Sequence, residues 1–176
     1  MRALGLSVWL ASLVSGCAAP PARSPAEGLP RYGPEDATLL DDGLSGHLFE
    51  TAFVPGNAGE DTHFRDRVLR AEQIWIVKVA TVSREGSLGD NRRYALSFKP
   101  LASLSGALPG EPITLTISGK DPAFHWLDRV QGGWVGHEVV LMVRRYREGD
   151  KVALHFHGEP NSPSLQSQIL EIRRAR

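Results

Sequence analysis

The sequence predicts a mainly β domain in which five antiparallel strands and several short helices follow a proline-rich tether. From residue 73 onward, apolar residues alternate with polar ones at the two-residue period of a half-buried strand. Glycine, proline and acidic residues separate these alternating runs, as expected of turns between strands. Before residue 35 the density of proline is typical of an extended linker outside any core.

The first residues combine a positive charge, a short apolar run and a cysteine that follows small side chains. Arg2 supplies the charge, and residues 3–13 are too short to cross a bilayer as a helix, which takes roughly 20 apolar residues. Val14-Ser15-Gly16-Cys17 resembles, position by position, the lipobox of bacterial lipoprotein signal peptides. The resemblance implies cleavage before Cys17, a diacylglyceryl thioether on its sulfur and an acyl chain such as palmitate on its amino group.

The residue after the cysteine bears on localisation. In the resembled signals, a residue other than aspartate at this position implies sorting to the outer membrane of a two-membrane cell, and Ala18 meets that condition. We therefore expect an exported chain whose lipid anchor makes the membrane its first partner. The chain has no second cysteine, and an unpaired thiol would be a liability in an oxidising compartment. The alternative is an ordinary cleaved signal whose cysteine stays free.

Residues 18–34 predict the tether. They contain prolines at several positions among small and polar residues, namely Pro20, Pro21, Pro25, Pro30 and Pro34. Proline removes backbone donors and favours the extended polyproline II conformation. At about 3.1 Å per residue, such a segment could hold the domain roughly 50 Å from the lipid.

Two short helices are predicted between the tether and the strands. Residues 34–42 begin with a proline and two acidic residues, which suit the first turn of a helix, and Gly43 is suited to end it. Residues 44–60 contain proline and glycines and predict a loop. Residues 61–71 have apolar residues at helical spacing after a polar capping residue.

The five strands are predicted at residues 73–83, 94–99, 112–118, 137–147 and 151–157. In the first strand, Trp75 and Val77 face one side of the sheet, and Ile74 and Ile76 face the other. Pro100 is expected to end or bulge the second strand, because proline cannot donate to a strand ladder.

The later elements follow the same reasoning. Residues 112–118 alternate cleanly between apolar and hydroxyl side chains, as in a half-exposed antiparallel strand. Residues 121–130 predict a helix with an acidic cap and a proline at its first position. Residues 148–150 predict the turn of a hairpin, and residues 163–172 predict a closing helix or strand.

Five antiparallel strands with a helix between the third and fourth are the element order of an OB-type barrel. The stretch 70–172 also resembles netrin-like, metalloproteinase-inhibitor-like barrels, through Ala71-Glu72 before the first strand, Gly106 in the middle and a late apolar hairpin over 139–156. The resemblance implies a fold only. Those inhibitors act through an exposed N-terminal cysteine and are held by disulfides, and this domain is expected to have neither. The predicted organisation is a signal peptide (1–16), a lipidated cysteine and proline-rich tether (17–33), a helical and loop lead-in (34–71) and an OB-like β-barrel domain (72–176).

Charge argues against a nucleic-acid partner. Lysine and arginine total 20, and aspartate and glutamate also total 20, so no strong field directs the chain to a polyanion. With its one cysteine committed to lipid, the folded domain has no disulfide. We expect apolar burial alone to hold it together.

The candidate metal ligands lie on the last predicted strand. His155, His157 and Glu159 alternate in sequence, so all three side chains are expected on one face. Two histidines and a carboxylate can hold zinc or Fe(II), and a complete site would need help from His125 or His137. The alternative is an edge strand whose polar residues simply face solvent.

The candidate binding residues are arginines and tryptophans. Arg144, Arg145 and Arg147 lie where the fourth strand leaves the core, and could contact phosphates of lipid headgroups, lipopolysaccharide or an acidic partner. The alternative is a solvated hairpin tip. Trp126 and Trp134 either plug an open barrel end or line a small binding pocket.

No catalytic residue is predicted. The chain has no Gly-x-Ser-x-Gly nucleophile motif and no glycine-rich phosphate loop, and its cysteine is assigned to lipid. Three hypotheses remain. The first is an outer-membrane lipoprotein whose non-catalytic β-barrel domain binds a protein or a cell-envelope component such as a glycan. The second is a metal-dependent enzyme or metal-handling protein, and the third is a structural envelope protein without a ligand.

Overall fold

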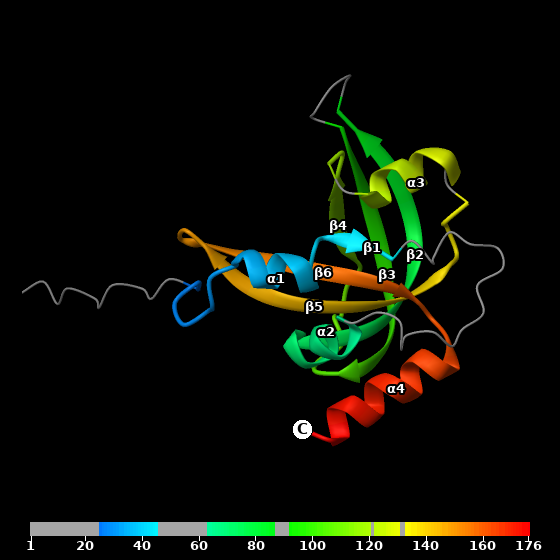
Figure 1. Ribbon diagram of the computed structural model, residues 1–176. Helices are drawn as coiled ribbons and strands as arrows, with labels where there is room; N and C mark the ends of the chain where they lie inside the picture. The colour runs from blue at the N-terminus through cyan, green and yellow to red at the C-terminus, as the bar shows by residue number, and fades with distance from the viewer. Residues whose placement is uncertain (1–24, 46–62, 87–91, 121, 131–132) are drawn as a thin grey trace, which may run out of the picture.

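The protein is built around one six-stranded sheet that curls into an open half-barrel (Figure 1). The computed structural model describes residues 25–45, 63–86, 92–120, 122–130 and 133–176. The strands are β1 (Gly43–Leu44), β2 (Gln73–Glu85), β3 (Arg93–Ser105), β4 (Ile113–Ser118), β5 (Glu138–Glu148) and β6 (Lys151–Pro160). The helices are α1 (Pro34–Leu39), α2 (Phe64–Arg70), α3 (Pro122–Val130) and α4 (Pro163–Arg174). The fold is mainly β, as the sequence predicts.

The strands lie in the order β1-β6-β5-β2-β3-β4. Neighbouring strands are antiparallel except β1 and β6, which run parallel. The five predicted strands correspond to β2 through β6. The sixth, β1, lies on the outer edge of β6 and was not predicted, because two residues are too few to show a period.

Pro100 bulges its strand without ending it. The pairing of β2 with β3 passes from Val77 opposite Pro100 to Ile76 opposite Ala102, which leaves one residue of β3 without a partner. A bulge of this kind accommodates a residue that cannot donate to the ladder. Beyond it, β3 continues to Ser105.

Both faces of the sheet are buried. Val139 and Leu141 of β5 belong to one apolar cluster together with Phe124 of α3. Val140 and Met142, the alternate residues of the same strand, belong to a second cluster with residues of α1, α2 and α4. Figure 1 shows α3 beside the upper part of the sheet and α2 and α4 beside its lower part. Burial on two sides explains why the centre of β5 is a continuous apolar run.

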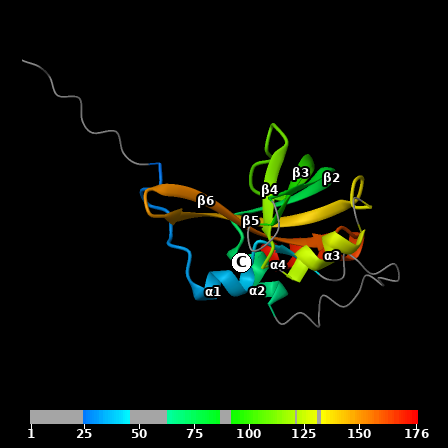
Figure 2. The ribbon, with the colours of Figure 1, turned by 90° about the horizontal axis from the view of Figure 1, so that it is seen from above.

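The helix α1 is three residues shorter than predicted. It ends at Leu39, and the chain turns at Asp42, whose φ of 56° lies in the left-handed region. Residues 25–33, the end of the predicted tether, follow the long β5–β6 hairpin, which projects from the sheet in both Figure 1 and Figure 2. Arg31 forms a parallel bridge to Arg147 on this hairpin, and Ala26 is buried.

The closing segment is a helix. The Ser162 hydroxyl accepts a hydrogen bond from the Leu165 amide at 3.1 Å, and Pro163 occupies the first turn of α4. Both features stabilise a helix start, which decides between the two predicted alternatives. No helix in the described part of the chain is long and apolar enough to cross a membrane.

Candidate functional site

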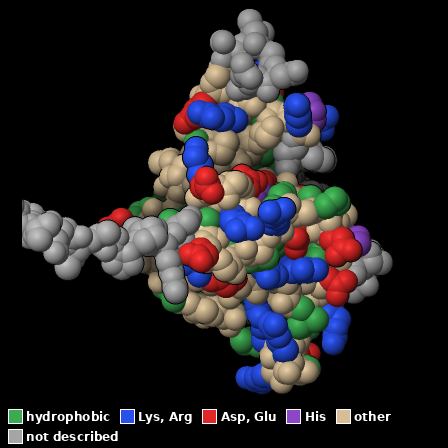
Figure 3. All heavy atoms as spheres, turned by 90° about the vertical axis from the view of Figure 1, so that its left-hand side faces the viewer, with side chains coloured by type: hydrophobic (Ala, Val, Ile, Leu, Met, Phe, Trp, Pro, Cys, Tyr) green, Lys and Arg blue, Asp and Glu red, His purple; other side chains and the backbone are tan. Residues whose placement is uncertain are grey.

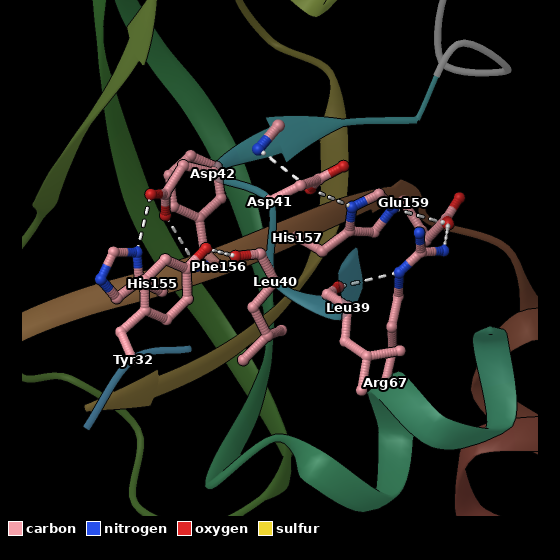
Figure 4. Close-up of polar contacts among 11 residues, drawn as sticks. Tyr32, Leu39, Leu40, Asp41, Asp42, Arg67, His155, Phe156, His157 and Glu159 are labelled. Atoms are coloured by element: carbon pink, nitrogen blue, oxygen red, sulfur yellow. Dashed lines mark hydrogen bonds and ion pairs between the residues drawn. The ribbon is translucent and has the colours of Figure 1, made fainter. Parts of the chain in front are cut away.

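The strand β6 brings His155, His157 and Glu159 to one face, as their spacing predicts. They lie opposite Arg144, Met142 and Val140 of β5, on the side of the sheet that the α1–α2–α4 cluster covers. All three are buried, with exposed fractions of 7%, 4% and 9% respectively. The alternative of solvent-facing residues on an edge strand is therefore wrong. The chain from Asp41 to Ser45 runs along β6 and covers them (Figure 4).

His155 is held between two carboxylates and an aromatic ring. Its Nδ1 lies 2.7 Å from Oδ2 of Asp42, and its Nε2 lies 3.2 Å from Oε1 of Glu148. The Tyr32 ring stacks on the imidazole with 3.5 Å between centroids and an interplanar angle of 2°. Burial, assisted by the charges of Asp42 and Asp41, raises the pKa of Tyr32 to about 12, so the phenol stays protonated at neutral pH.

His157 also lies between two carboxylates, at a more buried position. Its Nδ1 lies 2.7 Å from Oδ1 of Asp41, and its Nε2 lies 3.1 Å from Oε1 of Glu159. Burial alone would lower the pKa of His157, but hydrogen bonds and charge interactions with both carboxylates outweigh it and raise the pKa to about 9. The ring is therefore an imidazolium at neutral pH, donating from both nitrogens.

Arg67 of α2 extends this network to the helical layer. Its Nη1 lies 3.9 Å from Oε1 of Glu159, and its Nε donates to the Leu39 carbonyl at 2.9 Å. Arg67 is itself 9% exposed. The arginine thus joins the end of α1, the helix α2 and the far end of β6.

The carboxylates that face Nδ1 of the two rings, those of Asp42 and Asp41, come from the turn between α1 and β1. The Asp42 amide donates to the Phe156 carbonyl at 2.9 Å, and Asp42 Oδ1 accepts from the Phe156 amide at 3.1 Å. Burial raises the pKa of Asp42 despite its bond to His155. For Asp41, burial also acts to raise the pKa, but the bond to charged His157 outweighs it and the pKa is lowered.

We call this network the carboxylate–histidine clasp. Its members are Asp41, Asp42, Arg67, Glu148, His155, His157 and Glu159. It fixes the segment before β1 against β6 through two aspartate–histidine pairs, and the His157 ring is the more deeply buried of the two rings. The sequence indicated the β6 half of the clasp. It did not indicate Asp41 or Asp42, which lie more than a hundred residues away in sequence.

The clasp leaves no imidazole nitrogen facing open space, because each one faces a carboxylate oxygen. Within the described residues, no group of three or more histidine, cysteine or acidic side chains is positioned to hold a metal ion. His125 contacts the Phe124 ring and His137 contacts the Trp134 ring. Neither histidine supplements the clasp with a further ligand.

Comparisons with protein-family models, curated proteins and solved structures found no match. The function of the chain is therefore inferred from its own sequence and geometry.

The three hairpin arginines make separate contacts. The Arg144 guanidinium lies 5.4 Å from the centroid of the Tyr146 ring and donates to the Arg70 carbonyl at 3.3 Å. Arg145 forms a salt bridge with Glu72, which lowers the pKa of that carboxyl. The Arg147 amide donates to the Pro30 carbonyl, so its backbone positions the end of the tether.

Of the two candidate tryptophans and the cysteine, the structure describes only the Trp134 side chain. Trp134 is 3% exposed and packs in the α3-side cluster, so it belongs to the core. The side chain of Trp126 lies outside the described residues, as does Cys17 with the whole of the predicted signal peptide. The proposed roles of Trp126 and Cys17 remain predictions.

A polar groove of about 620 Å³ opens between α1, α2 and β5. Its charged lining residues are Glu35, Asp66, Arg70, Arg144 and Arg176. Only Arg144 was a candidate from the sequence. The other four come from α1, from α2 and from the residue pair after α4, and no local sequence pattern predicts that they converge.

Proposed function

We propose that this chain is an outer-membrane lipoprotein, anchored through acylated Cys17, whose folded domain binds a protein or cell-envelope component without catalysing a reaction. The observation that carries the anchoring is in the sequence. The single cysteine of the chain follows Val14-Ser15-Gly16 and a short apolar run. Two or more acyl chains hold a protein stably at a bilayer, so the domain needs no membrane-binding surface of its own for attachment.

The state of the histidines supports a non-catalytic role. A general base or a metal ligand needs an imidazole nitrogen with a free lone pair. His157 is protonated at neutral pH and buried between two carboxylates. Both nitrogens of His157 contact carboxylates of the fold, and each nitrogen of His155 also lies within hydrogen-bond distance of a carboxylate oxygen.

We further propose that β2 through β6 form an open sheet of OB type. Their spatial order, β6-β5-β2-β3-β4, is the order in which such a barrel arranges its five strands. Within the described residues β4 does not pair with β6, and β1 occupies the β6 edge. On this proposal, β1 takes the position that a closing strand would otherwise use.

The anchoring is tested in cells of the native host. We expect the wild-type chain to incorporate labelled palmitate and to fractionate with the outer membrane. Cys17→Ser should incorporate none and lose that fractionation. Equal labelling of both forms, or wild-type protein in the soluble fraction, would contradict the proposal.

The metal-dependent alternative rests on one observation, the shared face of His155, His157 and Glu159 beside Asp41 and Asp42. Zinc binding there requires at least one ion pair of the clasp to break and the imidazolium to lose its proton. Calorimetric titration of the purified full chain with Zn²⁺ distinguishes the two functions. We expect no binding heat in the wild type. Stoichiometric binding that His157→Gln abolishes would favour the metal site.

A further inference from the structure

We propose that the groove between α1, α2 and β5 binds the headgroup of an amine-bearing phospholipid, with the phosphate on its arginines and the ammonium on its carboxylates. The groove measures about 620 Å³, within the range of roughly 300–1,000 Å³ that small-molecule sites occupy. This proposal rests on the function proposed above, because a bilayer lies near the groove only if the chain is anchored to a membrane.

The arginine side of the groove suits a phosphate. Arg70, Arg144 and Arg176 line it from α2, from β5 and from the end of the described chain. Arg70 forms a salt bridge with Asp36 at 3.4 Å, and Arg144 donates one N–H to the Arg70 backbone carbonyl. Burial and the charge of Arg176 lower the pKa of Arg173, so positive groups crowd this end of the molecule. Guanidinium groups bind phosphate through several N–H donors.

The acidic side of the groove selects for a second charge on the ligand. Glu35 lies in the first turn of α1 and Asp66 in the first turn of α2, and both line the groove. Among the described residues, neither carboxylate has a hydrogen-bond or ion-pair partner of its own. They would repel a bare phosphate and attract an ammonium group. A ligand with both charges satisfies the whole lining.

The distribution of charge over the surface agrees with a local site. Seen from the left of Figure 1, basic and acidic side chains are interspersed, and basic ones are more frequent toward the α4 end (Figure 3). With equal totals of basic and acidic residues, long-range attraction to an anionic surface is weak. Recognition therefore depends on short-range pairing within the groove.

The place of the groove along the chain favours a lipid source. Glu35 follows Cys17 by 18 residues, and a chain of that length reaches at most roughly 60 Å when fully extended. If Cys17 carries the anchor, the groove cannot leave the neighbourhood of the bilayer. The headgroups there are at high local concentration.

The test is calorimetry on the full chain, purified from membranes in a non-ionic detergent. The soluble probes are glycerophosphoethanolamine, glycerophosphoglycerol and inorganic phosphate. We expect glycerophosphoethanolamine to bind about tenfold more tightly than either of the other two, because only it satisfies both sides of the groove.

Matched variants test whether the arginine side of the groove binds the phosphate. Arg70→Gln and Arg144→Gln should each weaken binding of glycerophosphoethanolamine about tenfold, as expected for losing a charge-assisted hydrogen bond. Arg144→Lys should retain part of the affinity. Arg65→Gln, an exposed residue of α2 outside the groove, should leave it unchanged. Circular dichroism melts check that every variant is folded.

A second variant and its control test the carboxylate side of the groove. Glu35→Gln should reduce the affinity for glycerophosphoethanolamine to that for glycerophosphoglycerol, whereas Glu171→Gln on the exposed side of α4 should not. Absence of binding, or equal affinity for all three probes, would overturn the proposal. Tighter binding of inorganic phosphate would assign the groove to free phosphate instead. Because the probes are soluble, these results do not depend on whether Cys17 is acylated, which mass spectrometry determines separately.

Discussion

His157 couples the stability of the fold to pH. Its pKa rises from an ordinary 6.5 to about 9 in the folded protein, so the folded state binds the proton more tightly than the unfolded state does. The stabilisation is fully present below pH ~6.5 and is lost as pH rises through about 9. By linkage it is on the order of 3 kcal/mol.

Urea denaturation at a series of pH values between 6 and 10 measures this effect. We expect the free energy of unfolding of the wild type to fall across this range. His157→Gln should remove most of the slope, and His125→Gln, a change at an exposed histidine of α3, should keep it. A slope that survives in His157→Gln would mean that another group is responsible.

A second prediction concerns Asp42, which combines a left-handed backbone conformation with a charge that burial disfavours. Asparagine tolerates that backbone region and can still accept the Phe156 amide. Alanine does neither. We expect Asp42→Asn to lower the free energy of unfolding by less than about 1 kcal/mol and Asp42→Ala by roughly 2–3 kcal/mol. Equal losses in urea denaturation would contradict this reading.

These residues mark the limit of what the sequence predicted about the site. The alternation of His155, His157 and Glu159 is a local property of one strand, and it correctly predicted a shared face. Their partners Asp41 and Asp42 were assigned to a predicted helix. No local pattern reveals that this helix ends early, because the two aspartates bind His155 and His157, which lie on a strand distant in sequence.

At the scale of elements, β1 depends on a glycine of β6. A Cβ on Gly158 would overlap Cδ2 of Leu44 and lie 3.3 Å from both Leu141 and Val139. All three neighbours are buried, so they can yield little. The missing side chain is what allows the short strand to approach.

Gly158→Ala should therefore lower the free energy of unfolding by roughly 1–3 kcal/mol, as overpacking usually does. It should also speed hydrogen exchange at the Ser45 amide, which donates to the Gly158 carbonyl at 2.8 Å. Gly110→Ala is the matched control, since a Cβ there meets nothing within 4 Å. Unchanged stability and exchange in Gly158→Ala would show that β1 is not seated in this way.

The strands β2 and β4 were predictable because each carries its own period. Their residues alternate between two faces as the sequence indicates, with Trp75 and Ile74 of β2 in different clusters. The sequence pattern of residues 163–172 fits either a helix or a strand, although Ser162 and Pro163 together form a helix-start signal. The strand β1 could not be predicted, since its stability comes from β6 and from the clasp.

On the scale of the whole molecule, the segment 31–45 acts as a strap from the predicted tether to the sheet. It is held by the stacking of Tyr32 on His155, by the two aspartates and by the pairing of β1 with β6. If the chain is anchored through Cys17, any pull on the anchor reaches the domain through this strap. The clasp then lies where a tethered domain needs its attachment to be firm.

The most direct test of the anchored, non-catalytic account is intact-mass and peptide mass spectrometry of the protein isolated from its native host. The account predicts a mature amino terminus at Cys17 that carries a diacylglyceryl group and an additional acyl chain. A chain that retains residues 1–16, or a mature terminus with an unmodified Cys17, would contradict it.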